Sequence, residues 1–176
     1  MEINVAQLLK ENIGSTRSYE VSGEVDILGD GGESTVSGEV SLMRTDRSIL
    51  VRGKLSTGAD ITCCRCLVPL SWPLELRIED EYYPTVDVVS GAPVSVPDEP
   101  GCFTIDKKHM IDLTEAVRQY ALLVLPMKPL CRRDCAGLCP ECGGNLNLGP
   151  CGCPPRPVDP RWVVLTEIAN EQKGTE

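Results

Sequence analysis

Ten cysteines constrain this chain of 176 residues more than any other feature, because eight of them fall in closely spaced pairs. Such pairs form disulfides in an oxidising compartment and bind metals in a reducing one. We expect no secretory leader, because the first residues lack a basic stretch followed by an apolar run. No segment contains the ~20 apolar residues that a membrane helix needs. The spacings therefore predict metal binding in a soluble, cytoplasmic protein. The pairs are Cys63/Cys66, Cys131/Cys135, Cys139/Cys142 and Cys151/Cys153.

The last four of these cysteines are predicted to form one closed, structural metal site. A zinc ion held by four thiolates needs sulfurs about 2.3 Å away, and two cysteines separated by two residues reach one ion if the chain turns tightly. Pro140, Gly143 and Gly144 favour such a turn, and residues 145–150 supply another. The predicted ligands are Cys139, Cys142, Cys151 and Cys153.

The other two pairs lie far apart in the sequence, and neither can complete a four-thiolate site alone. We expect Cys63 and Cys66 to meet Cys131 and Cys135 across the fold and to share a second metal ion. In an alternative arrangement, Cys131 and Cys135 join Cys139 and Cys142 instead. Cys64 and Cys102 are predicted to be spare thiols outside any site.

Zinc is the predicted cofactor, with two ions in all, and iron is the alternative because an all-cysteine site does not identify its metal. A thiol redox function is the alternative to a structural one. Redox C-x-x-C motifs lie at a helix N-terminus, which lowers the pKa of the first thiol. The residues after Cys142 are Gly-Gly-Asn-Leu-Asn, which do not begin a helix. The sequence therefore favours a structural role.

Alternating apolar and polar residues predict an α+β fold built on an antiparallel β meander. Pro73 cannot donate a backbone hydrogen bond, so its strand is predicted at a sheet edge or with a bulge. The four strand patterns cover residues 36–42, 49–55, 59–63 and 70–78.

A few helices are expected to pack with this sheet. One is predicted after Asp112 as N-cap, with Glu115 as its capping-box partner, and ends at Pro126. A second is predicted to open at Asp159-Pro160, with Trp162, Leu165, Ile168 and Ala169 on its apolar side. Residues 1–20 carry a short helical pattern around Val5, Leu8 and Leu9.

The chain is predicted to divide into two parts. Residues 1–126 form an α+β core domain, in which a proline-rich stretch at about 84–104 is a long, mobile loop. Residues 127–176 form a cysteine-rich, zinc-ribbon-like metal-binding tail with a closing helix.

Charge and composition limit the functions that this chain can have. Its net charge of −9 argues against a broad basic face that binds nucleic acid on its own. The single histidine, His109, has no nucleophile beside it in the sequence, and no phosphate-binding glycine motif is present. We therefore predict no catalytic residues and no enzyme activity.

Several segments resemble one bacterial family, the large ribosomal RNA subunit accumulation proteins. The segments are Ile111-Asp-Leu-Thr-Glu, Leu125-Pro-Met-Lys-Pro-Leu-Cys131, Cys135-Ala-Gly-Leu-Cys-Pro-Glu-Cys142 and Asp159-Pro-Arg-Trp162, with the strand that leads into Cys63-Cys-Arg-Cys66. By position, Cys63 and Cys66 match the family's first cysteine pair, and Cys131 to Cys153 match the tail of its longer members.

The resemblance implies a non-enzymatic ribosome biogenesis factor that supports accumulation or processing of large-subunit (23S) ribosomal RNA. It implies a ribosomal protein, a processing factor or the ribosomal RNA itself as partner, and the acidic charge favours a protein. A generic zinc-ribbon adaptor outside the ribosome is a further alternative.

Overall fold

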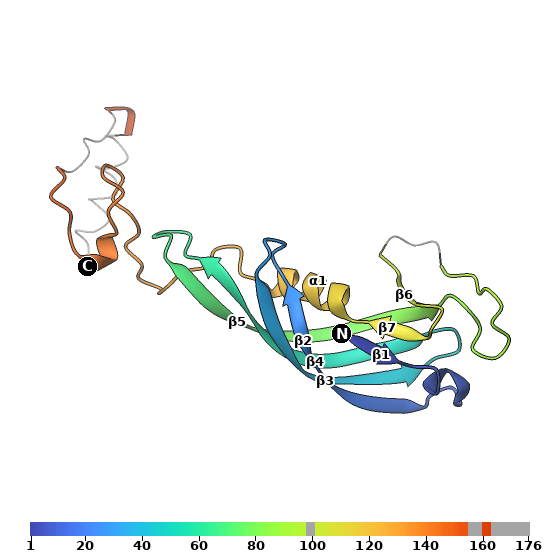
Figure 1. Ribbon diagram of the computed structural model, residues 1–176. Helices are drawn as coiled ribbons and strands as arrows, with labels where there is room; N and C mark the ends of the chain where they lie inside the picture. Colours follow the sequence, from blue (N-terminus) through green and yellow to red (C-terminus); the bar gives the residue numbers. More distant parts are fainter. Residues whose placement is uncertain (98–100, 155–159, 163–176) are drawn as a thin grey trace, which may run out of the picture. The chain divides into compact units, whose positions relative to one another are not determined.

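The computed structural model describes residues 1–97, 101–154 and 160–162, and the chain falls into two compact units (Figure 1). The first unit holds residues 1–62 and 69–129, and the second holds residues 63–68 together with the chain from residue 130 onward. The segment 63–68 thus belongs to the second unit, although it lies within the range that we assigned to the core domain. The predicted division between residues 126 and 127 stays a prediction.

The first unit is built on a five-stranded sheet. Its strands are β2 (Thr16–Asp26), β3 (Glu33–Arg44), β4 (Ile49–Thr62), β5 (Pro69–Pro84) and β6 (Phe103–Ile105). They are ordered β2-β3-β4-β5-β6, with antiparallel pairing from β2 to β5 and a parallel pairing of β6 with β5. The predicted antiparallel meander is confirmed.

The strand boundaries differ from the prediction in two ways. The patterns at 49–55 and 59–63 belong to the single strand β4, and β2 was not predicted. β4 continues because Gly58 pairs with Pro73 of β5, so the polar stretch between the two patterns remains in the ladder. Pro73 has no strand on its other side, because β6 pairs only with residues 82–84; the predicted edge position is therefore correct within the described chain.

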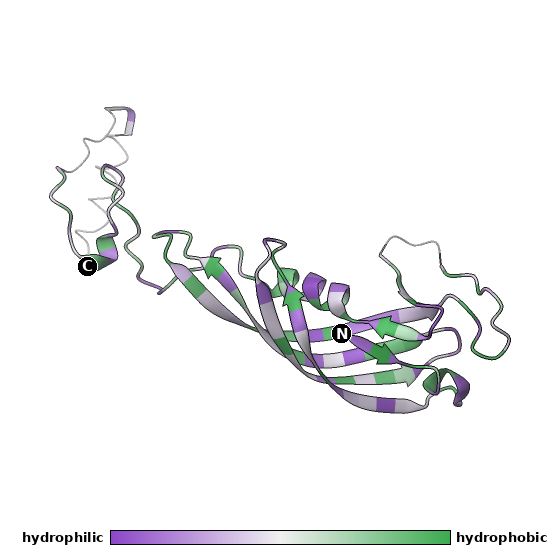
Figure 2. Cartoon of the chain, in the orientation of Figure 1, coloured by the Kyte–Doolittle hydropathy of each residue, from purple (hydrophilic) through white to green (hydrophobic). Residues whose placement is uncertain are grey.

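Residues of alternating polarity give the sheet one apolar and one charged face, which appears as alternating colours along the strands in Figure 2. On the apolar face Leu55 lies opposite Leu76. On the other face Glu39 lies opposite Lys54, and Arg52 forms an ion pair of 2.8 Å with Glu79. The alternation has a period of two residues, so each strand buries one side.

One helix, α1 (Thr114–Val124), contacts β5 and β2. Val117 and Ala121 of α1 are fully buried in the core. The hydroxyl of Tyr120 accepts a bond from the backbone N–H of Glu79 (3.2 Å) and donates one to its carbonyl oxygen (3.0 Å). The helix therefore satisfies backbone groups on the open edge of β5, which would otherwise be available to pair with another strand.

The predicted N-cap of this helix is wrong by one residue. Leu113 is the N-cap, and Oδ1 of Asp112 accepts a bond from the Thr114 N–H at 2.9 Å. The capping box is also wrong, since Oε1 of Glu115 accepts from Nε2 of Gln119 (3.0 Å) within the helix. The helix ends at Val124, two residues before Pro126, as the restriction before proline requires.

The remaining elements of the first unit are short. β1 (Glu2–Asn4) pairs antiparallel with β7 (Met110–Asp112), and the predicted N-terminal helical pattern is a single 3-10 turn, η1 (Leu8–Lys10). The chain is therefore mostly sheet, with one α-helix among the described residues. No described helix has the length and apolarity that a membrane span requires.

The predicted loop at 84–104 is partly ordered. Val86 bridges Pro93, and the Asp87 N–H donates to the Ala92 carbonyl at 2.8 Å. At its end, Phe103 stacks on the buried ring of Tyr82 with centroids 5.1 Å apart, which holds β6 against β5. The mobility of this loop stays a prediction, and residues 98–100 lie outside the described chain.

In the second unit the described backbone forms turns, one isolated bridge between Leu138 and Asn145, and two 3-10 helices, η2 (Leu146–Leu148) and η3 (Pro160–Trp162). η3 falls within the range of the second predicted helix, whose other residues Asp159, Leu165, Ile168 and Ala169 lie outside the described chain, so that helix stays a prediction.

Candidate metal centres

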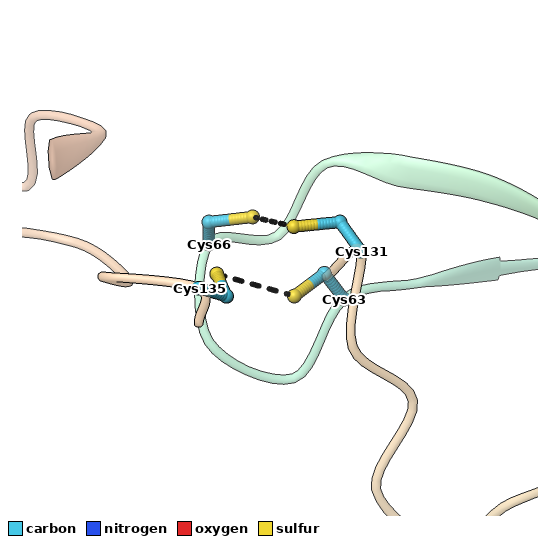
Figure 3. A group of neighbouring side chains, drawn as sticks. All are labelled: Cys63, Cys66, Cys131 and Cys135. Atoms are coloured by element: carbon cyan, nitrogen blue, oxygen red, sulfur yellow. Dashed lines mark hydrogen bonds between the residues drawn. The ribbon is translucent and has the colours of Figure 1, made fainter. Parts of the chain in front are cut away.

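The first candidate centre begins at the turn that connects β4 to β5. The Cys63 N–H donates to the Val68 carbonyl, and the Leu67 N–H donates to the Cys63 carbonyl, both at 2.9 Å. These two bonds close a tight turn in which Leu67 takes a positive φ of 58°. The turn brings the sulfurs of Cys63 and Cys66 into one group, as Figure 3 shows.

A second pair of sulfurs faces this turn (Figure 3). The Cys135 sulfur lies 3.8 Å from that of Cys63, and the Cys131 sulfur lies 3.6 Å from that of Cys66. All four sulfurs lie within 4.8 Å of one another. Metal–sulfur bonds of about 2.3 Å in a tetrahedron place sulfurs about 3.8 Å apart, whereas a disulfide bond is only about 2.05 Å long. The group therefore has the spacing of a four-thiolate metal site.

The second candidate centre begins at a separate turn, residues 139–144, which has the same backbone hydrogen-bond pattern. The Gly143 N–H donates to the Cys139 carbonyl (2.9 Å), and the Cys139 N–H donates to the Gly144 carbonyl (2.8 Å). Gly143 takes a φ of 71°, at the position that Leu67 occupies in the first turn. The sulfurs within 4.8 Å of one another here are those of Cys139, Cys142, Cys151 and Cys153.

The structure thus brings together each predicted set of four cysteines. Cys131 and Cys135 lie with Cys63 and Cys66, and the alternative grouping with Cys139 and Cys142 is not formed. The two thiols predicted to be spare belong to neither group: Cys64 is exposed within the first turn, and Cys102 is half-buried beside β6.

Backbone and side-chain donors make some of these thiols unusually acidic. The backbone N–H of Cys66 lowers the pKa of Cys63 to about 6, and the backbone N–H of Cys142 does the same for Cys139. Conversely, the neighbouring Cys142 raises the pKa of Cys153 to about 12. Thiols so close together cannot all ionise without a compensating cation, and a bound dication supplies that charge.

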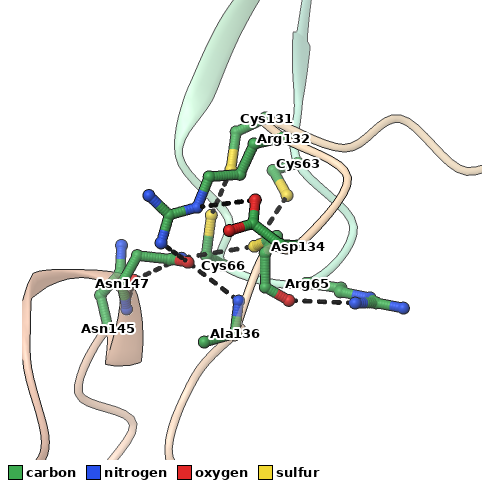
Figure 4. Close-up of polar contacts among 10 residues, drawn as sticks. Cys63, Arg65, Cys66, Cys131, Arg132, Asp134, Ala136, Asn145 and Asn147 are labelled. Carbon is green, nitrogen blue, oxygen red and sulfur yellow. Dashed lines mark hydrogen bonds and ion pairs between the residues drawn. The ribbon is translucent and has the colours of Figure 1, made fainter.

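Polar contacts that the sequence did not reveal join Cys135 of the first group to neighbouring side chains (Figure 4). Nη1 of Arg65 donates to the Cys135 carbonyl at 3.0 Å, and Nδ2 of Asn147 donates to the Cys135 sulfur at 3.3 Å. The Asn147 contact lowers the pKa of Cys135. Asn147 lies between the two last pairs in the sequence and was predicted only to form a turn. Its contact with Cys135 could not be foreseen without the path of the loop.

The described residues of the second unit contain no buried cluster of aliphatic or aromatic side chains. In its described residues, the buried side chains are those of Cys63, Cys66, Cys135 and Cys139. Segments that cannot bury enough apolar surface need disulfides, metals or partners to fold. The donor set, the sulfur spacing and the burial of cysteines in the described residues therefore fit a pair of metal ions, and four thiolates per ion suit zinc or iron.

Comparison with protein families finds a match over residues 51–169 to the family described as large ribosomal RNA subunit accumulation protein YceD. Uncharacterized proteins of Mycobacterium bovis and Mycobacterium tuberculosis share 30% identity over 128 residues, which are 72% of this chain and 58% of each relative. One of Mycobacterium leprae shares 31% over 121 residues, which are 68% of this chain and 52% of the relative. The chain therefore spans little more than half the length of these curated relatives. No solved structure gives a significant match.

Proposed function

The chain belongs to the family of the large ribosomal RNA subunit accumulation protein YceD, and on that premise we propose that it supports accumulation or processing of 23S ribosomal RNA in the bacterial cytoplasm. The observation that carries the proposal is the family match over residues 51–169, a range that contains both cysteine groups. The role is that of a ribosome biogenesis factor, with the two groups as structural zinc sites.

Zinc in this account holds the second unit together. The first site joins the 63–68 turn to the segment 131–135, which follows more than sixty residues later in the sequence. The second site closes the loop between Cys139 and Cys153. Because cysteines supply the buried side chains in the described part of this unit, the binding of zinc contributes most of the folding free energy of that part.

The composition of the two cysteine groups supports a non-enzymatic role. A catalytic zinc keeps one position open for water or substrate, whereas four thiolates close the coordination shell. The chain's single histidine, His109, lies in the first unit and in neither cysteine group.

The partner that the charge favours is a basic protein, such as a ribosomal protein, or a processing factor. A net charge of −9 opposes the approach of phosphate backbones. Two arginines beside the first group donate hydrogen bonds to other groups of this chain. Arg65 binds the Cys135 carbonyl, and Arg132 binds Oδ1 of Asn147.

Depletion of the protein in its host tests the functional proposal. We expect the ratio of large-subunit to small-subunit ribosomal RNA to fall and to recover when wild-type protein or Cys64→Ser is supplied. The double variant Cys63→Ser/Cys66→Ser should restore the ratio poorly. An unchanged ratio on depletion contradicts the proposal.

Cross-linking in cells, followed by mass spectrometry and by RNA sequencing, separates the possible partners. Recovery of basic ribosomal proteins or processing factors supports the partner proposed above. Direct cross-links to 23S RNA would show that the partner is RNA and not a protein. Recovery of partners unrelated to ribosomes would favour the zinc-ribbon adaptor.

A thiol redox switch is the second candidate, and the acidic thiols of Cys63 and Cys139 favour it. It requires these thiols to be reactive in the purified protein. Turnover with a dithiol–disulfide substrate supports the redox candidate, and absence of turnover removes it.

A further inference from the structure

The side-chain amide of Asn147 uses its whole hydrogen-bonding capacity. Its Nδ2 donates to the Cys135 sulfur (3.3 Å) and to Oδ1 of Asn145 (2.8 Å). Its Oδ1 accepts from the Ala136 N–H (2.9 Å) and from Nη2 of Arg132 (2.8 Å). An amide has two donor hydrogens and two acceptor lone pairs, so none is left over (Figure 4).

These partners also fix the orientation of the amide. A backbone N–H and a guanidinium can only donate, so the atom facing Ala136 and Arg132 must be the oxygen. The nitrogen therefore faces the Cys135 sulfur, and a flipped amide would lose both accepted bonds. Asn147 is accordingly a hydrogen-bond donor to one of the four sulfurs of the first group.

The position of Asn147 depends on the second group. The residue lies in the loop between Cys142 and Cys151, two members of that group. The loop is held near the first group by the bond from the Leu146 N–H to the Gly137 carbonyl (2.9 Å) and by the bridge between Leu138 and Asn145. When Cys139, Cys142, Cys151 and Cys153 share a metal, both ends of this loop are fixed.

We propose that Asn147 is a positioning residue that couples the two metal sites. Zinc at the second group orders the loop, and the ordered loop places the Nδ2–H of Asn147 on the Cys135 sulfur. That bond stabilises the thiolate and so strengthens zinc binding at the first group, because donors to ligand atoms tune metal affinity. By thermodynamic reciprocity, zinc at the first group strengthens binding at the second.

The first test compares variants of the full-length protein by competition between bound Zn²⁺ and a chelator. Cys63→Ser/Cys66→Ser reports the second group alone and so assigns the two release steps. Asn147→Ala should weaken zinc binding at the first group by about 10- to 100-fold. The matched control is Leu148→Ala, since Leu148 lies in the same turn and is 88% exposed; its affinities should equal those of the wild type.

Asn147→Asp separates the sulfur contact from a merely structural role. An aspartate keeps both accepted bonds, from Ala136 and Arg132, but loses both donated bonds, to the Cys135 sulfur and to Oδ1 of Asn145, and places a negative charge beside the thiolate. We expect it to weaken the first site at least as much as alanine does. Asn145→Ala removes the bond between the two amides and leaves the donor to the sulfur, so it should weaken the first site less than Asn147→Asp does. Equal losses in the two variants would show that Asn147 only holds the loop, and the proposal is wrong.

The coupling itself is tested by a double-mutant cycle. Cys151→Ser/Cys153→Ser removes the second site without touching the first, and it should weaken the first site by the same factor as Asn147→Ala. Adding Asn147→Ala to that variant should then have no further effect, because the loop is already released. If the losses in zinc affinity caused by Asn147→Ala and by Cys151→Ser/Cys153→Ser multiply in the combined variant, the two sites are independent and the coupling is wrong.

The inference rests on the zinc sites proposed above, but it fails separately from them. A wild-type protein that binds no zinc overturns those sites. A wild-type protein that binds zinc tightly, with unchanged affinity in all Asn147 variants, overturns only the coupling.

Discussion

Each C-x-x-C turn places the residue after its second cysteine in the left-handed region. Gly143 takes a φ of 71° at no cost in side-chain contacts, whereas Leu67 takes a φ of 58° with a side chain that is 62% exposed. A leucine in this conformation is strained by roughly 1–2 kcal/mol. The two turns therefore have the same backbone conformation, and the leucine of the first turn adopts it less readily than the glycine of the second.

Replacing Leu67 by glycine should therefore stabilise the first centre. The relieved strain exceeds the extra entropy that glycine has in the unfolded chain, so we expect a gain of up to about 1 kcal/mol in the free energy of unfolding. The measurement is thermal unfolding of the zinc-loaded protein. Val68→Gly, in the same turn but without a positive φ, should only destabilise; a similar loss for Leu67→Gly would contradict the argument.

Substitutions of the adjacent residues Cys63 and Cys64 should have different effects on the zinc content of the protein. Cys63→Ser removes a buried sulfur of the first group, so the purified protein should carry one equivalent of zinc fewer. Cys64→Ser changes an exposed thiol outside both groups and should leave the zinc content unchanged. Colorimetric zinc release from denatured protein gives both values. Equal zinc contents would mean that the first group does not bind the metal.

The pairing of cysteines could be predicted because a four-thiolate site leaves few ways to combine four close pairs. The polar contacts around the sites could not. Asn147 and Arg65 have nothing in their local sequence that relates them to Cys135, since both contacts depend on how distant segments meet.

At the scale of elements, β3 and β4 approach closely where glycine replaces a side chain. A Cβ added at Gly38 would lie 2.2 Å from the Lys54 carbonyl oxygen and 2.9 Å from the Leu55 Cα. Backbone atoms cannot move aside as the end of a side chain can. This position therefore requires glycine.

Gly38→Ala should destabilise the first unit by about 3 kcal/mol, because it forces two paired strands apart. Gly58→Ala is the matched control within the same sheet, since its added Cβ would lie an ordinary 3.7 Å from the Trp72 carbonyl oxygen. Urea unfolding followed by tryptophan fluorescence should show a lower midpoint for the first variant only. Equal midpoints would show that the sheet accommodates the methyl group.

The elements that could be predicted are those with strong patterns. β5 alternates Leu74, Leu76 and Ile78 with charged residues, and α1 has a regular apolar stripe. β2 was missed because only Val21 and Val25 among its side chains are buried, so its alternation is weak. The parallel pairing of β6 depends on the stacking of Phe103 on Tyr82, which a short segment of three residues does not reveal.

At the scale of the whole molecule, the two units have different sources of stability. The first buries apolar side chains from both of its sheets and from α1, whereas the described part of the second buries cysteines. Hydrophobic burial does not depend on metal, but the proximity of four thiolates does.

Removing zinc with a chelator under reducing conditions should therefore unfold the second unit and spare the first. Hydrogen exchange should become fast at the N–H groups of Cys63, Cys139 and Leu146, which are bonded in the two turns and their loop. The central residues of β3 and β4 should stay protected. Loss of protection in both units together would show that the first unit also depends on the metal.

We propose that two closed four-cysteine zinc sites hold the second unit together. Mass spectrometry of the purified chain under native and denaturing conditions, without added metal, tests it most directly, because it counts metal ions and oxidised thiols together. We expect two zinc ions under native conditions and ten reduced thiols after denaturation. A native mass without metal, with the mass deficit of disulfide bonds, would contradict it.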